Sequence, residues 1–401
     1  MSKVFPFRLF WKLRAVRFRT STQATIVQSL LFFLLITPPA TALLELPSVF
    51  NFTSQAFAQS SGKQTNSQLR HQLENYLISI EGRDDWTRLM LAILKSVTAV
   101  ERVLAQGVSV NIRGTEEFHG VTPLMFASGI GVQEIVKILV VKGARLNDTD
   151  TQGNSALSKA AHKGHLDTVR FLLQQGANPN AETNQKWTAL MFASHRGQID
   201  VLKTLLKHGA RADLQNELGM SSVMYAAQNG HLEIVRILIQ RGAKVDLTSL
   251  NGSTALIWEI RSGQEKIAEV LLEAGAKTDS LEKEFRRSPL LLAAMYGREA
   301  IVQKLLSSGA DVGVVDKQGE NALLLALSNN HFETANLLIR SGIPINSSDN
   351  KKRTPLMVVV AQGSFELTKI LLKTGAEVNA RDYAEKTALM IAAGEGNVKI
   401  V

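Results

Sequence analysis

The stretch "TALMFASHRGQ" at residues 188–198 combines a start signal and a stop signal for one short helix. Thr188 can accept a hydrogen bond from the free amides of a first helical turn, and an apolar run follows it. Gly197, nine residues later, can adopt the left-handed conformation in which many helices end. Between them, His195–Arg196 is open to two interpretations, a catalytic pair or one position of a repeat.

The same pattern recurs with a period of 33 residues, with one spacing of 34 residues between Thr254 and Ser288. Nine apolar runs each follow a residue able to cap a helix: Thr122, Ser155, Thr188, Ser221, Thr254, Ser288, Asn321, Thr354 and Thr387. Nine residues after each of these comes a glycine or, once, an asparagine: Gly131, Gly164, Gly197, Gly230, Gly263, Gly297, Asn330, Gly363 and Gly396. A second apolar helix and a short polar segment complete each unit. A fixed period of this length predicts stacked units of helix, turn, helix and protruding loop.

Two further stretches, "HLDTVRFLLQQGANPN" (165–180) and "HLEIVRILIQRGAKVD" (231–246), show the second half of the unit most clearly. Together with the capped runs, these residues resemble the ankyrin repeat, of an exported bacterial type. The resemblance covers residues 119–401, as eight full units and an incomplete ninth. It implies an all-α ankyrin-repeat solenoid of stacked helix-turn-helix units with protruding β-hairpin-like loops.

Residues 69–118 are interpreted as an N-terminal capping helix followed by a degenerate repeat. Apolar residues at helical spacing predict a helix over 69–80. The segment 86–111 fits a repeat that is one residue short between Thr87 and Gly107. At the other end, "TALMIAAGEGNVKIV" (387–401) stops within the second helix of its unit, so we expect an unfinished core layer. Either a truncated reading or a frayed end would account for it.

The N-terminal residues have the pattern of an export signal. Six Lys/Arg and no acidic residue precede position 45, and the apolar core "IVQSLLFFLLI" (26–36) is shorter than a bilayer span. We expect a signal peptide over 1–58, cleaved after Ala42 or Ala58, and then a polar linker over 59–68. The alternative is an uncleaved anchor that makes the protein a membrane-tethered adaptor. Both interpretations place the repeats outside the cytoplasm, and cleavage would release a periplasmic or extracellular protein.

The composition argues against several function classes. The formal net charge is +9, but residues 59–401 carry 39 basic and 35 acidic side chains, too even a balance for a nucleic-acid-binding face. The absence of cysteine excludes disulfides, a thiolate nucleophile and cysteine metal sites. No phosphate-binding loop, dinucleotide fingerprint or nucleophile elbow is present. We therefore expect no cofactor, and a monomer.

Three histidines raise the alternative of a hydrolase or metal protein: His162, His165 and His195. The repeat accounts for His165, because His231 occupies the same position. The position of His195 carries glycine, glutamine, arginine and other residues elsewhere, which is not the behaviour of a fixed catalytic machine. We therefore favour a non-catalytic protein.

An aromatic column is formed by Phe126, Phe192, Tyr225 and Trp258, and aliphatic residues continue it. The aliphatic continuation favours the interpretation that the column is core packed between units. The alternative is a ladder of aromatic rings that stacks on a ligand.

In the ankyrin family, the ends of the first helices and the loop tips line a concave groove that binds proteins. Mapped onto this sequence, the candidate partner-binding residues are Lys186, Trp187, His195, Arg196, Gln228, Asn229, Arg261, Phe285, Met295 and Tyr296. We expect Lys186, Trp187, His195, Arg196 and Arg261 to lie close together and to bind a partner with an acidic segment. The loop at 279–287 contains the one extra residue, so it is predicted to project as a second contact. An ordinary solvated face is the alternative.

Overall fold

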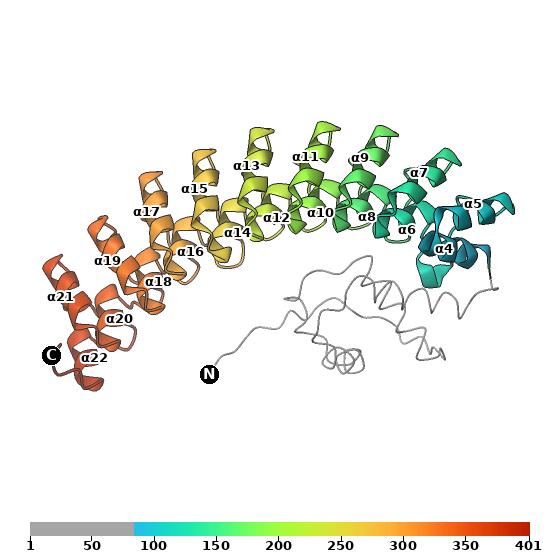
Figure 1. Ribbon diagram of the computed structural model, residues 1–401. Helices are drawn as coiled ribbons and strands as arrows, with labels where there is room; N and C mark the ends of the chain where they lie inside the picture. Colours follow the sequence, from blue (N-terminus) through green and yellow to red (C-terminus); the bar gives the residue numbers. More distant parts are fainter. Residues whose placement is uncertain (1–83) are drawn as a thin grey trace, which may run out of the picture. The chain divides into compact units, whose positions relative to one another are not determined.

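The computed structural model describes residues 84–401, shown in colour in Figure 1. The predicted export signal, the linker over 59–68 and the helix over 69–80 lie outside the described residues. The described chain divides into two compact units, one formed by residues 84–108 and 114–118 and the other by residues 109–113 and 119–401. No helix of the described part is long and apolar enough to cross a bilayer.

The first unit contains two helices and a short 3-10 turn: α4 (Asp85–Lys95), α5 (Val97–Ala105) and η1 (Glu116–Phe118). The Asp84 carboxylate accepts the N–H of Thr87 at 2.7 Å, so α4 is capped at Asp84. Thr87, where a strict repeat would place the cap, is instead buried in the first helical turn. Trp86 stacks on Phe118 with 4.2 Å between ring centroids. The segment is a helix pair, and its role as an end cap stays a prediction.

The second unit is a row of helix pairs, in which each first helix packs on the first helices of the neighbouring pairs (Figure 1). The first helices are α6 (Pro123–Ile130), α8 (Ala156–Lys163), α10 (Ala189–Arg196), α12 (Ser222–Gln228), α14 (Ala255–Ser262), α16 (Pro289–Met295), α18 (Ala322–Ser328), α20 (Pro355–Ala361) and α22 (Ala388–Gly394). The second helices are α7 (Gln133–Val141), α9 (Leu166–Gln174), α11 (Ile199–Lys207), α13 (Leu232–Gln240), α15 (Glu265–Glu273), α17 (Glu299–Ser307), α19 (Phe332–Arg340) and α21 (Phe365–Lys373). The prediction of an all-α repeat solenoid is confirmed.

The helix boundaries follow from the predicted caps and stops. All nine capping residues accept a hydrogen bond from the backbone N–H three residues further on; Thr188, for example, accepts that of Met191 at 3.3 Å. All nine stop residues have positive φ, including Asn330 at 62°. At Gly197 a second constraint applies, because a Cβ would stand 2.7 Å from Cε1 of His231 in the next repeat. Glycine is therefore required there by backbone conformation and by packing.

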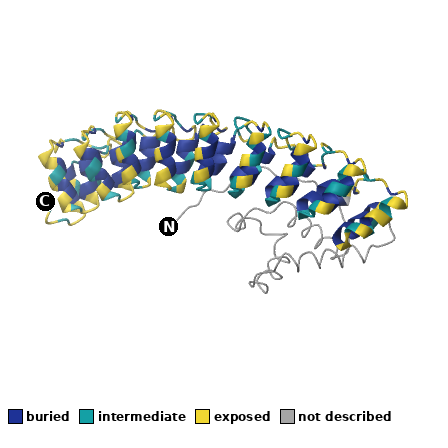
Figure 2. Ribbon diagram, turned by 45° about the horizontal axis from the view of Figure 1, so that its top comes forward, coloured by how far each residue is buried: buried dark blue, intermediate teal, exposed yellow. Residues whose placement is uncertain are grey.

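The core lies on the facing sides of successive helix pairs, as Figure 2 shows by the buried residues along each helix. In α10, for example, Leu190, Met191 and Ala193 are fully buried. The last pair differs, because residues 398–400 form a turn instead of a second helix and Leu389 and Met390 of α22 are 58% and 52% exposed.

The loop tips are joined into a continuous backbone ladder. In each rung, a tip N–H donates to a carbonyl of the preceding tip: Thr151 to His119, Asn184 to Gln152, Glu217 to Gln185, Leu250 to Leu218, Lys283 to Asn251, Lys317 to Phe285, Asn350 to Gln318 and Tyr383 to Lys351. The donor and acceptor of one tip are neighbours in sequence, except at Lys283 and Phe285, which Glu284 separates. The extra residue of the 34-residue unit is therefore Glu284. It lies between the donor and the acceptor of its tip, and the ladder continues on both sides.

Candidate functional site

Four aromatic rings from two neighbouring repeats pack into a layer that we term the aromatic platform: Trp187, Phe192, His195 and Tyr225. Trp187 is stacked on both sides, with centroid distances of 4.9 Å to Phe192 and 4.4 Å to Tyr225. His195 meets Trp187 and Tyr225 edge-on at 6.0 and 5.6 Å. Trp187 is half-buried and fixed between its neighbours.

Local hydrogen bonds hold the platform in place. The Thr183 hydroxyl accepts the backbone N–H of Trp187 at 3.0 Å, which positions the indole at the base of its loop. The Asn216 side-chain amide donates to the Tyr225 hydroxyl at 2.7 Å. Burial raises the pKa of Tyr225 to about 12, with the Asn216 hydrogen bond acting in the opposite direction. The hydroxyl is therefore neutral in the physiological range and serves as a fixed polar edge.

The polar edge of the platform crosses three repeats. The Asn229 amide donates to Nδ1 of His195 at 3.1 Å. Burial, then the charges of Arg196 and His231, lower the pKa of His195, so its ring is neutral at pH 7. The Arg196 guanidinium donates to Nε2 of His162 through Nε at 3.3 Å and Nη2 at 2.9 Å. These contacts join His195 to Asn229 of the following repeat and Arg196 to His162 of the preceding one.

Positive charge gathers at the C-terminal ends of α8 and α10, where the helix dipole favours cations. Burial, and after it the charges of Arg196 and Lys159, lower the pKa of Lys163 to about 8. Lys159 itself forms an ion pair with Asp150 at 2.8 Å, both side chains being at least 97% buried. The platform is thus bordered by basic groups that repel one another, and Lys186 stands exposed on the adjoining loop at φ 59°.

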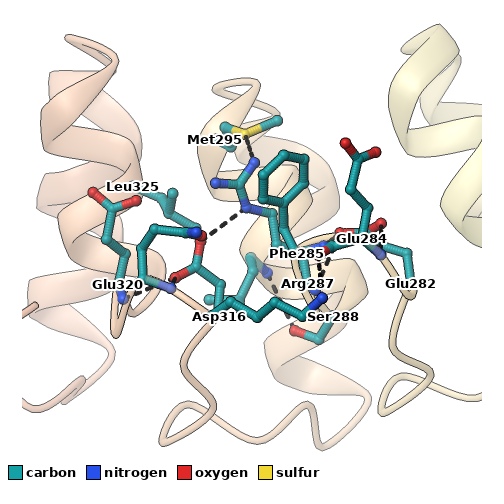
Figure 3. Close-up of polar contacts among 12 residues, drawn as sticks. Glu282, Glu284, Phe285, Arg287, Ser288, Met295, Asp316, Glu320 and Leu325 are labelled. Atoms are coloured by element: carbon teal, nitrogen blue, oxygen red, sulfur yellow. Dashed lines mark hydrogen bonds and ion pairs between the residues drawn. The ribbon is translucent and has the colours of Figure 1, made fainter. Parts of the chain in front are cut away.

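A second group of candidate residues surrounds Arg287, and we term it the arginine cluster: Phe285, Arg287, Met295 and Asp316. Arg287 Nε donates to the buried Asp316 carboxylate at 3.0 Å, and Nη1 lies 2.9 Å from Sδ of Met295 (Figure 3). The guanidinium carbon is 4.8 Å from the centroid of the Phe285 ring. Arg287 therefore fastens its loop to the next repeat, and Phe285 keeps about a third of its surface exposed.

Arg261 contacts the loop that leads into the arginine cluster. Its Nη2 is 3.9 Å from Oε2 of Glu282, and its guanidinium carbon is 5.6 Å from the Trp258 ring centroid. The half-buried arginine turns toward the buried carboxylate of the following loop, and its expected closeness to the Trp187 group stays a prediction. Gln228 is half-buried at the end of α12, and Tyr296 is 39% exposed just beyond α16.

The remaining histidine positions have structural partners. Nε2–H of His165 donates to the Gly129 carbonyl at 3.1 Å, and His231 does the same to the His195 carbonyl at 3.2 Å. Burial is the main reason that the pKa of His165 is lowered. Within residues 84–401, no group of three or more His, Asp or Glu side chains converges as a metal site. The repeat thus assigns His165 an inter-repeat bond.

Sequence reasoning missed the acceptors that fix these side chains. The polar residue five or six positions before a cap accepts loop N–H groups, as Asp316 does from Gln318 and Glu320 at 2.9 and 3.0 Å. Asp150, Asn216 and Glu282 occupy the same position in their repeats. Their recurrence at the repeat period was the available signal. The basic side chain that pairs with such an acceptor, however, could not be predicted from one repeat alone.

A family model described as ankyrin repeats (3 copies) matches residues 125–216, 190–282, 290–382 and 342–401, which together make up more than half of the chain. The chain belongs to the ankyrin repeat family. Ankyrin repeats mediate protein–protein interactions, so the repeats of this chain form a protein–protein interaction domain. A search of curated proteins gave no match.

Proposed function

We propose that this ankyrin-repeat protein is a non-catalytic scaffold that acts outside the cytoplasm. It binds a protein partner through a concave face centred on the aromatic platform, where an acidic segment of the partner meets Lys163, Lys186 and Arg196. The observation that carries the proposal is the double stacking of Trp187 beside three basic side chains. It needs no cofactor and acts as a monomer.

The platform has the properties of a preorganised binding surface. Trp, Tyr and Arg are the residues most often found as interface hot spots. Trp187 and Tyr225 already hold one conformation through stacking, so binding costs little further side-chain ordering. The charge of Lys163 is disfavoured mainly by burial and then by Arg196 and Lys159, and a partner carboxylate would relieve that repulsion.

Export is supported by the basic N-terminal residues and the short apolar run that follows them. N-terminal sequencing of the secreted chain distinguishes the alternatives. A first residue of Gln59 or Leu43 supports cleavage, whereas full-length protein in the membrane fraction supports the tethered adaptor.

The binding surface is tested with the full-length protein and a labelled oligoglutamate peptide as the acidic probe. Arg196→Glu should abolish binding, whereas Lys203→Glu, the same charge change on the exposed side of α11, should leave it unchanged. Trp187→Ala should weaken binding of the oligoglutamate peptide. It should also reduce, to a similar extent, the recovery of partner proteins from a cell extract. Equal binding by both charge variants would show that the surface lies elsewhere on the solenoid.

A further inference from the structure

One position in the first helices breaks the pattern of the core. The fifth residue after each cap is small in the other eight units: Ala127, Ala160, Ala193, Ala226, Ala293, Ala326, Val359 and Ala392. In α14 it is Glu259, whose exposed fraction is 0%. Its helix packs on α12, α15 and α16, and its neighbours Ile257 and Ile260 are also fully buried. A carboxyl group thus occupies a site that the repeat otherwise fills with methyl groups.

The polar atoms around this site are incompletely satisfied. Neither carboxylate oxygen of Glu259 makes a hydrogen bond of normal geometry within residues 84–401. The same holds for the buried Nε of Arg298 and Nε1 of Trp258. Arg298 is the one arginine in its column, where the other units carry Val132, His165, Gln198, His231, Gln264, His331, Ser364 and Asn397. Both departures from the repeat therefore meet at the junction between the α14 and α16 units.

The charged groups near Glu259 do not neutralise it. Burial raises the pKa of Glu259 to about 8; the Gln264 backbone N–H and the Arg298 charge oppose this rise, and Glu265 of α15 adds to it. Helix α16 carries no ionisable side chain, and the only one on α12 is Tyr225, whose hydroxyl is bonded to Asn216. On α14 itself, Arg261 faces Glu282. The closed junction therefore holds the protonated carboxyl.

We propose that Glu259 makes the α14–α16 junction a proton-controlled weak point in the solenoid. The repeats on its two sides stack tightly while the carboxyl is neutral. When it loses its proton to solvent, an isolated charge in the apolar core is strongly disfavoured, so the carboxylate must reach water. Because α14 is packed on α12, α15 and α16, access to water requires it to separate locally from a neighbour, and the charge of Arg298, which acts on Glu259, points to the α16 side.

This weak point lies between the aromatic platform and the arginine cluster in sequence, since α14 falls between α12 and α16. Opening would uncouple the two surfaces without unfolding either. Proton control of this junction does not depend on which partner the platform binds.

Hydrogen exchange followed by mass spectrometry on the full-length protein tests the weak point at about pH 5.5 and about pH 8.5, with labelling times scaled to intrinsic exchange. Peptides from α14 and α16 should open about tenfold or more readily at the higher pH, while those from α20 and α21, away from the junction, should not change. Glu259→Ala, which introduces the alanine found in most other repeats, should abolish the difference in opening between the two pH values. Glu259→Gln should do the same at nearly constant side-chain volume. Glu269→Ala, which removes an exposed carboxylate of α15, should retain it.

Equal opening at both pH values in the natural protein would overturn the proposal, as would a pH effect that persists in Glu259→Ala. Arg298→Gln provides an independent test of direction. Removing that positive charge should move the transition to higher pH, and a shift to lower pH would contradict the assignment.

Discussion

The aromatic platform and the arginine cluster share one repeat position, since Trp187 and Arg287 both stand directly before a cap, yet the half-buried arginine of each region has a different acceptor. Arg287 donates to the Asp316 carboxylate, so its charge is balanced within the solenoid. Arg196 donates to an imidazole nitrogen of His162, an acceptor without charge. The acceptor that a neighbouring repeat supplies thus decides whether a half-buried arginine joins the repeats by an ion pair or by a hydrogen bond to an imidazole.

The largest effect on stability is expected from Asp316→Ala, which removes the carboxylate that pairs with Arg287. It leaves the guanidinium of Arg287 buried without a carboxylate and removes the acceptor for two loop amides. The free energy of unfolding should fall by about 3–5 kcal/mol, measured by chemical denaturation. Asp382→Ala is the control, because that half-exposed carboxylate accepts two loop amides, and it should cost about 1 kcal/mol. Equal losses would show that the ion pair contributes nothing.

Trp187→Ala should break the platform itself. It removes the ring stacked between Phe192 and Tyr225, and we expect a loss of about 2 kcal/mol since the indole is only half-buried. Trp187→Phe should recover most of that stability by keeping the stack. The same denaturation experiment compares both variants, and a full loss in Trp187→Phe would point to the indole nitrogen instead of stacking.

Arg196→Ala should sharpen the contrast, because it removes a charge that has a neutral acceptor. Stability should change by less than about 1 kcal/mol. The pKa of Lys163 should rise from about 8 toward 10.5, read from the pH profile of amine labelling. In the natural protein the unfolded lysine holds its proton more tightly, so stability grows as pH rises from about 8 to 10.5. Arg196→Ala should flatten this slope, whereas Lys203→Ala should leave it intact.

The smallest effect is expected from Lys186→Gly on the loop beside the platform. Lys186 has φ 59° at a position where Gly219 and Gly252 stand in later repeats. Relief of the left-handed strain should stabilise the fold by up to about 1 kcal/mol, while oligoglutamate binding weakens. Lys352→Gly, with φ 57°, should stabilise similarly without affecting binding. Weaker binding in both variants would indicate a non-specific charge effect.

The fold could be predicted because its signals are local and occur nine times. A cap and a stop nine residues apart define a helix without knowledge of its neighbours, and even Asn330 in place of glycine has the expected positive φ. The site was harder to predict, since side-chain direction is set across repeats. Arg261 turns to Glu282 of the following loop, and Trp187 packs on Tyr225 of the next repeat.

Glu259 shows a signal that was present in the sequence and passed unnoticed. Alignment of the nine runs places a glutamate among alanines and a valine, which marks the site as exceptional without a structure. What alignment could not provide is whether a partner accompanies the charge. A positive charge comes from Arg298 of the adjacent unit, and only the stacked helices show that it acts on Glu259.

The backbone ladder of the loop tips has a consequence for protein engineering. Each rung involves only main-chain atoms of two adjacent tips, so removal or duplication of a whole 33-residue unit rejoins equivalent donors and acceptors. Glu284 shows that a tip also accommodates added length between its donor and its acceptor. The tip at 283–285 is therefore a natural insertion point for grafting foreign peptides, which the solenoid would display while its own register stays fixed.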